Sequence, residues 1–178
     1  MQLSLIALFP VLLASISTAL PSGTAPRTSI SKQQLADAQN KWRADTSAVS
    51  QFLSAVPSLS GRGGAQLAAA ARVALDAEND ELAHKAVLDA AFLGSDARVA
   101  AADDVLVAQG TFQAVVDALA LFARDGASMA PSEVAVLLRR ANAVRCARVL
   151  PAIDAYFRVA GEALHNGGFL LATRPDNC

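Results

Sequence analysis

The stretch Ser31–Pro57, SKQQLADAQNKWRADTSAVSQFLSAVP, decides the fold class of this chain. Its first residues fit a capping box, with Ser31 as N-cap and Gln34 three residues on. Apolar residues then recur at steps of three and four or their sums: Leu35, Ala38, Trp42, Val49, Phe52 and Val56. This spacing predicts one amphipathic helix of about 25 residues, which Pro57 and the turn Gly61–Gly64 end.

Three further stretches carry the same helical period, over residues 65–93, 96–124 and 131–164. The inner side of the first is expected to be marked by Leu67, Ala71, Leu75, Leu82 and Val87. Gly110 falls inside the second, which therefore forms either one kinked helix or two helices. Pro151 falls inside the third and is expected to break or kink it, because proline lacks the N–H and clashes with the preceding turn.

Alanine makes up more than a fifth of the chain, whereas aromatic residues are few. Because alanine is the best helix former and is depleted in strands, this composition nearly excludes an all-β fold. We predict an all-α fold, one compact bundle of four to five antiparallel amphipathic helices over residues 31–178. Lys and Arg number 15 against 16 Asp and Glu. Without a basic excess, binding to nucleic acid is not expected.

The N-terminus has the features of an export signal. Residues 1–19 contain no charged side chain, and their apolar run is too short and too interrupted for a transmembrane helix. Ser17 and Ala19 place small side chains where signal peptidase requires them, so cleavage is predicted after Ala19. Residues 20–30, rich in Pro, Ser and Thr, are predicted to form a flexible leader. The mature protein is therefore expected to be secreted, either free in the medium or held in the cell wall.

The two cysteines, Cys146 and Cys178, are expected to form a disulfide. Cys146 lies on the apolar stripe of the last helical stretch, and Cys178 is the final residue of the sequence. In an exported protein two cysteines most simply pair with each other. The segment between them is long enough to run back along the helix. Two alternatives stay open, namely two free thiols and a bridge between two chains.

No constellation of residues predicts catalysis. Glu81 and His84 have the E-x-x-H spacing of di-iron bundles, but such a site needs a second pair, and the sequence holds none. A zinc site from Asp80, His84 and a distant carboxylate is a weaker alternative. The pairs Asp80–His84 and Glu81–Lys85 are spaced i,i+4, which favours a solvated helix face. We expect no metal site, no cofactor and no enzymatic activity.

The candidate ligand-binding residues are Trp42, Asp45, Phe52 and Phe157. Trp42, the single tryptophan, lies on an apolar stripe, where it either anchors the core or forms a ligand platform. Asp45 falls on the same stripe and needs a cationic partner there, for which Arg145 and Lys85 are the candidates. Such an ion pair either fixes the register of the bundle or forms a polar anchor inside an apolar pocket.

Four motifs carry a family resemblance: DTSAVSQFL (Asp45–Leu53), ENDELAHKAVLDAA (Glu78–Ala91), QGTFQAVVDAL (Gln109–Leu119) and RCARVLPAIDAYF (Arg145–Phe157). They resemble a group of small secreted, all-helical proteins of filamentous fungi, over most of the mature chain. A fainter similarity is to the fungal hydrophobic-surface-binding and cell-wall galactomannoprotein group. The resemblance implies a fungal extracellular protein, and it carries no catalytic or binding residue over to this chain.

We therefore expect a secreted, effector-like helical bundle that acts by binding. Its partner would be a host protein, a cell-wall component or an apolar ligand. The alternative is a wall-associated protein whose helices open onto hydrophobic surfaces. A second alternative is an enzyme without a recognisable motif.

Overall fold

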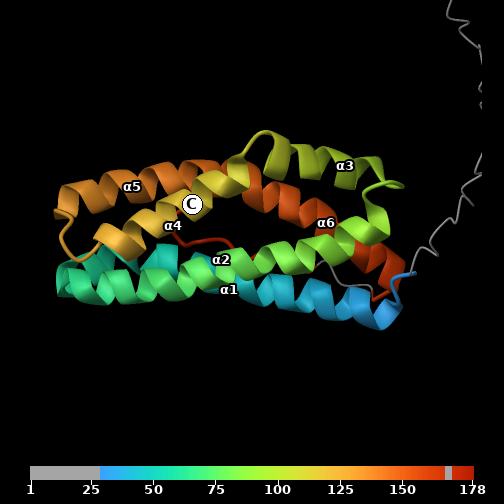
Figure 1. Cartoon of the computed structure of the whole chain (residues 1–178), viewed down its shortest axis with the longest axis horizontal. Helices are drawn as coiled ribbons and strands as arrows, with labels where there is room; N and C mark the ends of the chain where they lie inside the picture. The colour runs from blue at the N-terminus through green and yellow to red at the C-terminus, as the bar shows by residue number, and fades with distance from the viewer. Residues whose placement is uncertain (1–28, 167–169) are drawn as a thin grey trace, which may run out of the picture.

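The computed structural model describes residues 29–166 and 170–178, which form an all-α bundle without a strand in either range (Figure 1). The predicted signal peptide and residues 20–28 of the predicted leader lie outside the described residues. The elements, with η marking a π-helical segment, are α1 (Lys32–Arg62), α2 (Gly64–Phe92), α3 (Ala97–Asp103), η1 (Asp104–Ala108), α4 (Thr111–Asp125), α5 (Pro131–Val144), η2 (Arg145–Val149) and α6 (Leu150–Leu164).

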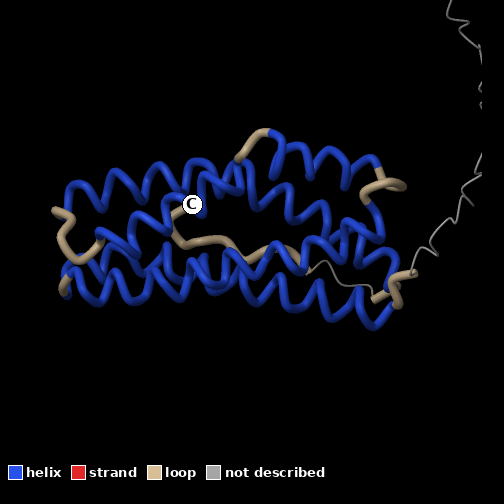
Figure 2. The backbone as a smooth tube through the Cα atoms, in the orientation of Figure 1, coloured by secondary structure: helices blue, strands red, loops and turns tan. Residues whose placement is uncertain are grey.

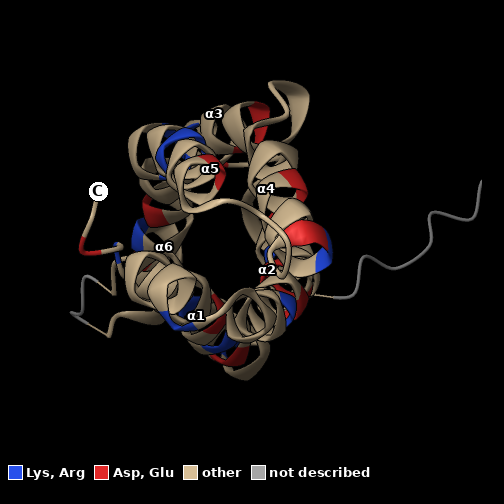
Figure 3. Ribbon diagram, turned by 90° about the vertical axis from the view of Figure 1, so that its left-hand side faces the viewer, with Lys and Arg blue, Asp and Glu red and all other residues tan. Residues whose placement is uncertain are grey.

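The helices pack side by side along the long axis of the molecule. Helix α1 packs along α2, α2 packs against α4, and α3 packs against α6, while α5 contacts both α4 and α1 (Figures 1 and 3). Loops are confined to the ends of the helices, except for the C-terminal segment, which runs back along the bundle (Figure 2). The predicted all-α bundle is confirmed.

Helix α1 begins where the sequence predicts and ends later. Ser31 Oγ accepts a hydrogen bond from the Gln34 N–H at 3.2 Å, and Gln34 Oε1 accepts one from the Ser31 N–H at 3.0 Å, so the capping box is present. The predicted end at Pro57 is wrong, because α1 continues through it to Arg62. A proline frees the carbonyl four residues before it. Here that carbonyl, of Leu53, accepts a hydrogen bond from Asn177 Nδ2 at 3.0 Å.

Two glycines make the reversal from α1 to α2 possible. Gly63 is the single residue between the two helices, and its φ of +126° is a conformation that L side chains rarely adopt. A Cβ on Gly64 would lie 2.4 Å from the carbonyl oxygen of Ala127, so only a glycine lets this turn approach the loop after α4. The predicted turn therefore lies within residues 61–64, but it is narrowed to Gly63 because α1 ends at Arg62 and α2 begins at Gly64.

The two interruptions predicted in the later stretches take different forms. At Gly110, which has a φ of +66°, the chain forms two helices, because η1 ends at Ala108 and α4 restarts at Thr111 with a bend of 42°. Near Pro151 the helix is not broken. Instead, η2 widens one turn just before the proline, and the Leu150 N–H bonds to the Arg145 carbonyl five residues back. A π-helical turn inserts one residue and so shifts the phase of the side chains that follow.

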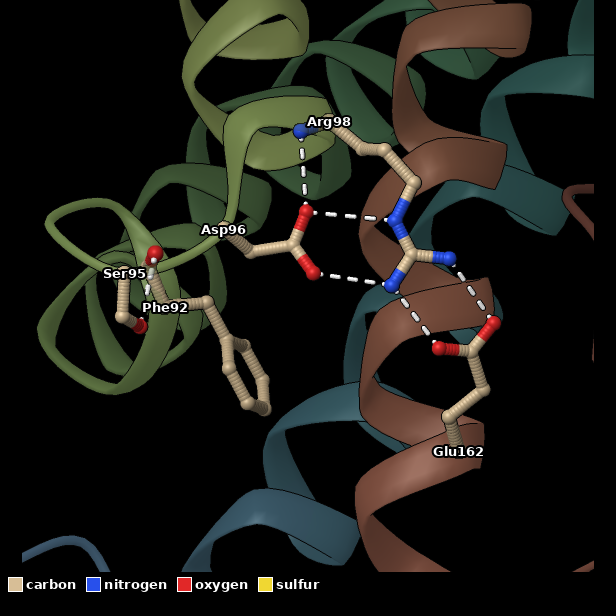
Figure 4. A network of polar contacts seen from close by, with 5 residues as sticks. All are labelled: Phe92, Ser95, Asp96, Arg98 and Glu162. Atoms are coloured by element: carbon tan, nitrogen blue, oxygen red, sulfur yellow. Dashed lines mark hydrogen bonds and ion pairs between the residues drawn. The ribbon is translucent and has the colours of Figure 1, made fainter.

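An ion-pair network fastens the start of α3 to α6 (Figure 4). Asp96 caps α3 by accepting a hydrogen bond from the Arg98 N–H at 2.8 Å. The Arg98 guanidinium bridges Asp96 and Glu162, with both nitrogen–oxygen contacts to Glu162 at 2.8 Å. The hydrogen bonds from Arg98 lower the pKa of Asp96 to about 2. All three groups face water, so the network orients the α2–α3 turn more than it stabilises the fold.

A heptad stripe on each long helix faces the core. In α1 its members are Leu35, Gln39, Trp42, Thr46, Val49, Leu53 and Val56, and in α2 they are Leu67, Ala71, Ala74, Glu78, Glu81, Lys85 and Leu88. Alternating steps of three and four residues are typical of helices packed as in a coiled coil. The predicted inner side of α2 is wrong in its second half, since Leu82 is 47% exposed whereas Glu78 and Glu81 are fully buried.

Candidate functional site

Three charged side chains and an indole form a polar layer inside the bundle, here called the charged layer: Glu78, Glu81, Arg145 and Trp42, each 0% exposed. Arg145 Nη1 donates a hydrogen bond to Glu78 Oε2 at 2.7 Å. Trp42 Nε1 donates one to Glu81 Oε2 at 2.8 Å. Arg145 Nη2 donates to the carbonyl of Thr46 at 3.2 Å and lies 3.6 Å from Glu81 Oε1. The layer thus ties α1, α2 and η2 together.

The charged layer holds two carboxyl groups and one guanidinium. Burial raises the pKa of Glu81 well above its usual range, and the charge of the neighbouring Glu78 raises it further. Burial also raises the pKa of Glu78, but Arg145 opposes that shift through its charge and its hydrogen bond. The shift is therefore larger at Glu81, where the charge of Glu78 adds to burial, than at Glu78, which Arg145 contacts directly.

We expect Glu81→Gln to stabilise the protein at pH 8 and to have little effect near pH 4. Because the folded-state pKa of Glu81 lies above its unfolded-state value, the folded protein binds a proton that the unfolded chain releases. The free energy of unfolding therefore falls as pH rises from the ordinary pKa through the raised one. Each unit of pKa difference corresponds to about 1.4 kcal/mol. Gln cannot titrate, so the variant lacks this decline.

Urea denaturation of Glu81→Gln and wild type at several pH values measures this difference. The matched control is Asp76→Asn, which replaces an exposed carboxylate on the same helix. The difference in the free energy of unfolding between this control and wild type should not follow the pH dependence expected for Glu81→Gln. A Glu81→Gln variant that is less stable than wild type at every pH would show that Glu81 is ionised in the folded protein.

The predicted partner of Asp45 is wrong. Asp45 is not on the buried stripe, which passes through Thr46, and its Oδ2 lies 3.2 Å from Nε2 of His84 rather than near Arg145 or Lys85. Both side chains are about one-fifth exposed in a shallow hollow between α1 and α2. Burial raises the pKa of Asp45, and the charge of His84 opposes the shift. The register-fixing ion pair expected at Asp45 is formed by Glu78 and Arg145 instead.

A second polar cluster surrounds Lys85, which the sequence placed on a solvated face. Lys85 is only 5% exposed, and its Nζ contacts carboxylates of both Asp89, at 2.7 Å, and Asp103. The same Nζ lies 5.3 Å from the ring centroid of Tyr156, whose hydroxyl donates a hydrogen bond to Asp89 Oδ1 at 2.6 Å. Burial, reinforced by Asp89, raises the pKa of Tyr156. This cluster joins α2 to α3 and α6.

The three aromatic candidates for ligand binding lie in the core and do not form one site. Trp42 packs edge-on against Phe157, with ring centroids 5.4 Å apart, and both are fully buried. Phe52 packs instead against Phe122, with centroids 5.7 Å apart. Of the two readings open for Trp42, the structure favours the packing anchor, because its ring is enclosed and its N–H is bonded to Glu81.

The last nine described residues, 170–178, form a segment here called the tail, which Cys146 and Cys178 fasten by a disulfide with an S–S distance of 2.02 Å. This is the intramolecular pairing predicted from the sequence. The tail lies between α1 and α5–η2–α6, a position here called the tail groove (Figures 2 and 3). The predicted stripe is off by one residue here, since Arg145 is fully buried and Cys146 is only half-buried. The phase shift at η2 explains the difference.

An apolar groove lies on the surface between α4 and α5, here called the α4–α5 groove. Its lining residues are Leu121, Met129, Ser132, Glu133, Val136, Leu137 and Arg140. Val136 is 38% exposed there. The cavity volume of about 320 Å³ reaches the lower end of the range for small-molecule sites.

Within residues 29–166 and 170–178, no group of three or more His, Cys, Asp or Glu side chains could hold a metal ion. In the same ranges no single helix is long and apolar enough to cross a membrane, although the bent pair Ala97–Ala108 and Thr111–Asp125 passes that test of length and composition. No protein-family model, curated protein or solved structure matches the chain.

Proposed function

We propose that this chain is an exported fungal binding protein that takes an apolar ligand into the α4–α5 groove, without chemistry. The observation that carries the proposal is the lining of that groove, where the exposed Val136 and the partly buried Leu121, Met129 and Leu137 lie beside the charged residues Glu133 and Arg140. Concave, mostly apolar sites with a few polar groups at the margin are typical of small-molecule binding. The Cys146–Cys178 disulfide supports export, because such bonds persist in oxidising compartments.

We expect Val136→Asp to weaken binding of the neutral apolar dye Nile red by about tenfold or more, because a carboxylate in the groove must lose water when the dye binds. Dye fluorescence in a titration with the folded protein gives the Kd. Val136 is partly exposed on α5, so the variant is expected to fold. The matched control is Val73→Asp, which places the same charge on an exposed valine of α2, outside the groove. Equal affinities for the two variants would contradict the proposal.

The alternative proposal, a wall-associated protein that opens onto hydrophobic surfaces, is favoured by the charged layer, whose groups would regain water if the helices separated. The fluorescence emission of Trp42, the single tryptophan, distinguishes the two functions when the protein adsorbs to polystyrene beads. It is fully buried in the closed bundle, so groove binding leaves its emission maximum unchanged. A red shift on adsorption would identify opening of the bundle instead.

A further inference from the structure

We propose that the tail groove is a binding site for an extended peptide, which the tail occupies in cis and the Cys146–Cys178 disulfide locks in place. The tail contains no helix or strand and runs along the groove beside α1 and α6 (Figures 1 and 2). A thiol reductant removes the covalent lock, so that a peptide in trans can compete with the tail for the groove. This site is separate from the α4–α5 groove.

Side chains of the groove bind the main chain of the tail. Five such contacts run from Arg43 Nε to Leu171 O (3.5 Å), from Ser50 Oγ to Thr173 O (2.7 Å), from Asn142 Nδ2 to Asn177 O (3.3 Å), from Ala172 N to Asp154 Oδ1 (2.7 Å) and from Asp176 N to Ser54 Oγ (2.9 Å). Main-chain hydrogen bonds of this kind give affinity for any extended peptide, and side-chain positions then add specificity. The groove therefore binds an extended main chain through these hydrogen bonds, and the side chains of the peptide determine which sequences bind more tightly.

Three side chains of the tail supply that specificity. Ala172 is 4% exposed and Pro175 is buried, so the groove accepts a small residue and, three positions later, a proline. Between them, Arg174 Nη2 donates a hydrogen bond to Asp154 Oδ2 at 2.7 Å. Asp154 thus binds both a main-chain N–H and a guanidinium. The partner that fits is an extended peptide with the pattern small–x–Arg–Pro.

The groove continues past the end of the tail. A hollow beside Cys178 and Asn177 is lined on the bundle side by Leu138, Arg139, Asn142, Ala143, Cys146 and Ala147. Asn142 donates through Nδ2 to Asn177, but its Oδ1 is buried and accepts no hydrogen bond from the described residues. The hollow indicates room beside the tail for a longer occupant.

The disulfide that locks the tail can be exchanged from solution, because Cys178 is exposed and Cys146 is half-buried. An attacking thiolate forms a new S–S bond to one sulfur as the Cys146–Cys178 bond breaks, and the other sulfur leaves as a thiolate. Glutathione completes the reduction when a second molecule displaces the first, which leaves as oxidised glutathione. A peptide thiolate can instead attack the mixed disulfide between glutathione and Cys146, which forms the peptide–Cys146 disulfide and releases glutathione as a thiolate.

The test uses the full, folded chain in a glutathione redox buffer. Two peptides are tested in separate reactions, and each competes with the tail for the groove. One has the sequence of residues 170–178, LLATRPDNC, and in the other the first eight residues are scrambled. Intact-mass analysis counts the protein that carries each peptide, and digestion without reduction assigns the peptide to Cys146. We expect the tail sequence to be captured about tenfold more than the scrambled one. This preference should vanish in urea, and equal capture in native buffer would overturn the proposal.

Variants of the groove separate recognition from simple thiol reactivity. Ser50→Ala and Asp154→Asn each remove a contact to the tail, so each should lower the preference for the tail sequence several-fold. Ser58→Ala is the control, since Ser58 lies on the same helix and bonds only to the Ala55 carbonyl. The wild-type comparison decides the proposal even if a variant is unstable. A preference unaffected by both Ser50→Ala and Asp154→Asn in folded protein would also overturn it.

Discussion

Replacement of Arg145 by methionine is expected to destabilise the folded protein by about 3–5 kcal/mol at neutral pH, the largest effect among the substitutions considered. Methionine fills a similar length of the core but leaves Glu78 without the guanidinium that binds its Oε2 at 2.7 Å. It also removes the hydrogen bond from Arg145 Nη2 to the Thr46 carbonyl. A carboxylate that is 0% exposed must then either stay charged without a partner or take up a proton. Urea denaturation measures the loss.

The pH dependence of that loss identifies its cause. Without Arg145, the opposing influence on the pKa of Glu78 is gone, so burial raises the pKa further. The cost of Arg145→Met should therefore shrink as pH falls toward 4, where Glu78 is protonated in both folded and unfolded chains. The double variant Glu78→Gln/Arg145→Met should recover part of the stability at neutral pH, because it removes the unpaired charge.

Arg158→Met is the matched control, an exposed arginine on α6 for which a change within about 0.5 kcal/mol is expected. An Arg145→Met variant as stable as this control would mean that water reaches the charged layer. The same result would remove the argument for a raised pKa at Glu81.

The fold could be predicted from the sequence because the apolar spacing, the capping box and the glycine turns all act locally. The charged layer and the polar cluster around Lys85 could not be predicted, because Glu78, Glu81 and Lys85 have the spacing of a solvated helix face. One signal was present: the heptad steps through Leu67 and Ala74 continue onto these three residues. A heptad that passes through charged residues and returns to Leu88 indicates charges that face the core.

The misplacement of Asp45 has a geometric origin. On a helix of about 100° per residue, position 45 lies about 60° to one side of Trp42 and position 46 about 40° to the other. Three- and four-residue spacings therefore admit both residues to the apolar stripe. The structure selects Thr46, whose hydroxyl bonds to the Trp42 carbonyl at 2.7 Å. A short hydroxyl side chain can donate its hydrogen bond to a carbonyl of its own helix and so remain buried. The Asp45 carboxylate instead lies near the surface and pairs with His84.

The contacts between the tail and α1 lie beyond any periodicity, because they join residues more than 100 positions apart in the chain. Pro57 predicts a helix end, because a proline removes a hydrogen bond. The Leu53 carbonyl that it frees is bonded by Asn177, so the helix continues. Local sequence cannot reveal that a distant side chain supplies the missing donor. The position of the tail therefore depends on tertiary contacts that local sequence cannot predict, whereas the helices can be predicted from local patterns.

Removal of the disulfide in the variant Cys146→Ser/Cys178→Ser is expected to lower the free energy of unfolding by about 3–4 kcal/mol. The bond closes a loop with a sequence separation of 32, and its loss lets the unfolded chain explore more conformations. For a chain of this size, each 1 kcal/mol corresponds to about 2–4 °C in Tm, so a decrease of about 6–16 °C is expected. The urea m-value should rise, because the unfolded chain without the bond exposes more surface.

Reduced wild-type protein is the control for the two serines, since a serine at the half-buried position 146 could introduce a polar effect of its own. The reduced protein and the double variant should lose the same stability. A loss below about 1 kcal/mol in both would mean that the bond stabilises little beyond the hydrogen bonds of the tail. Those hydrogen bonds remain possible in the reduced chain, where Asn177 can still reach the Leu53 carbonyl. The disulfide therefore acts mainly on the unfolded state, and the tail contacts act on the folded one.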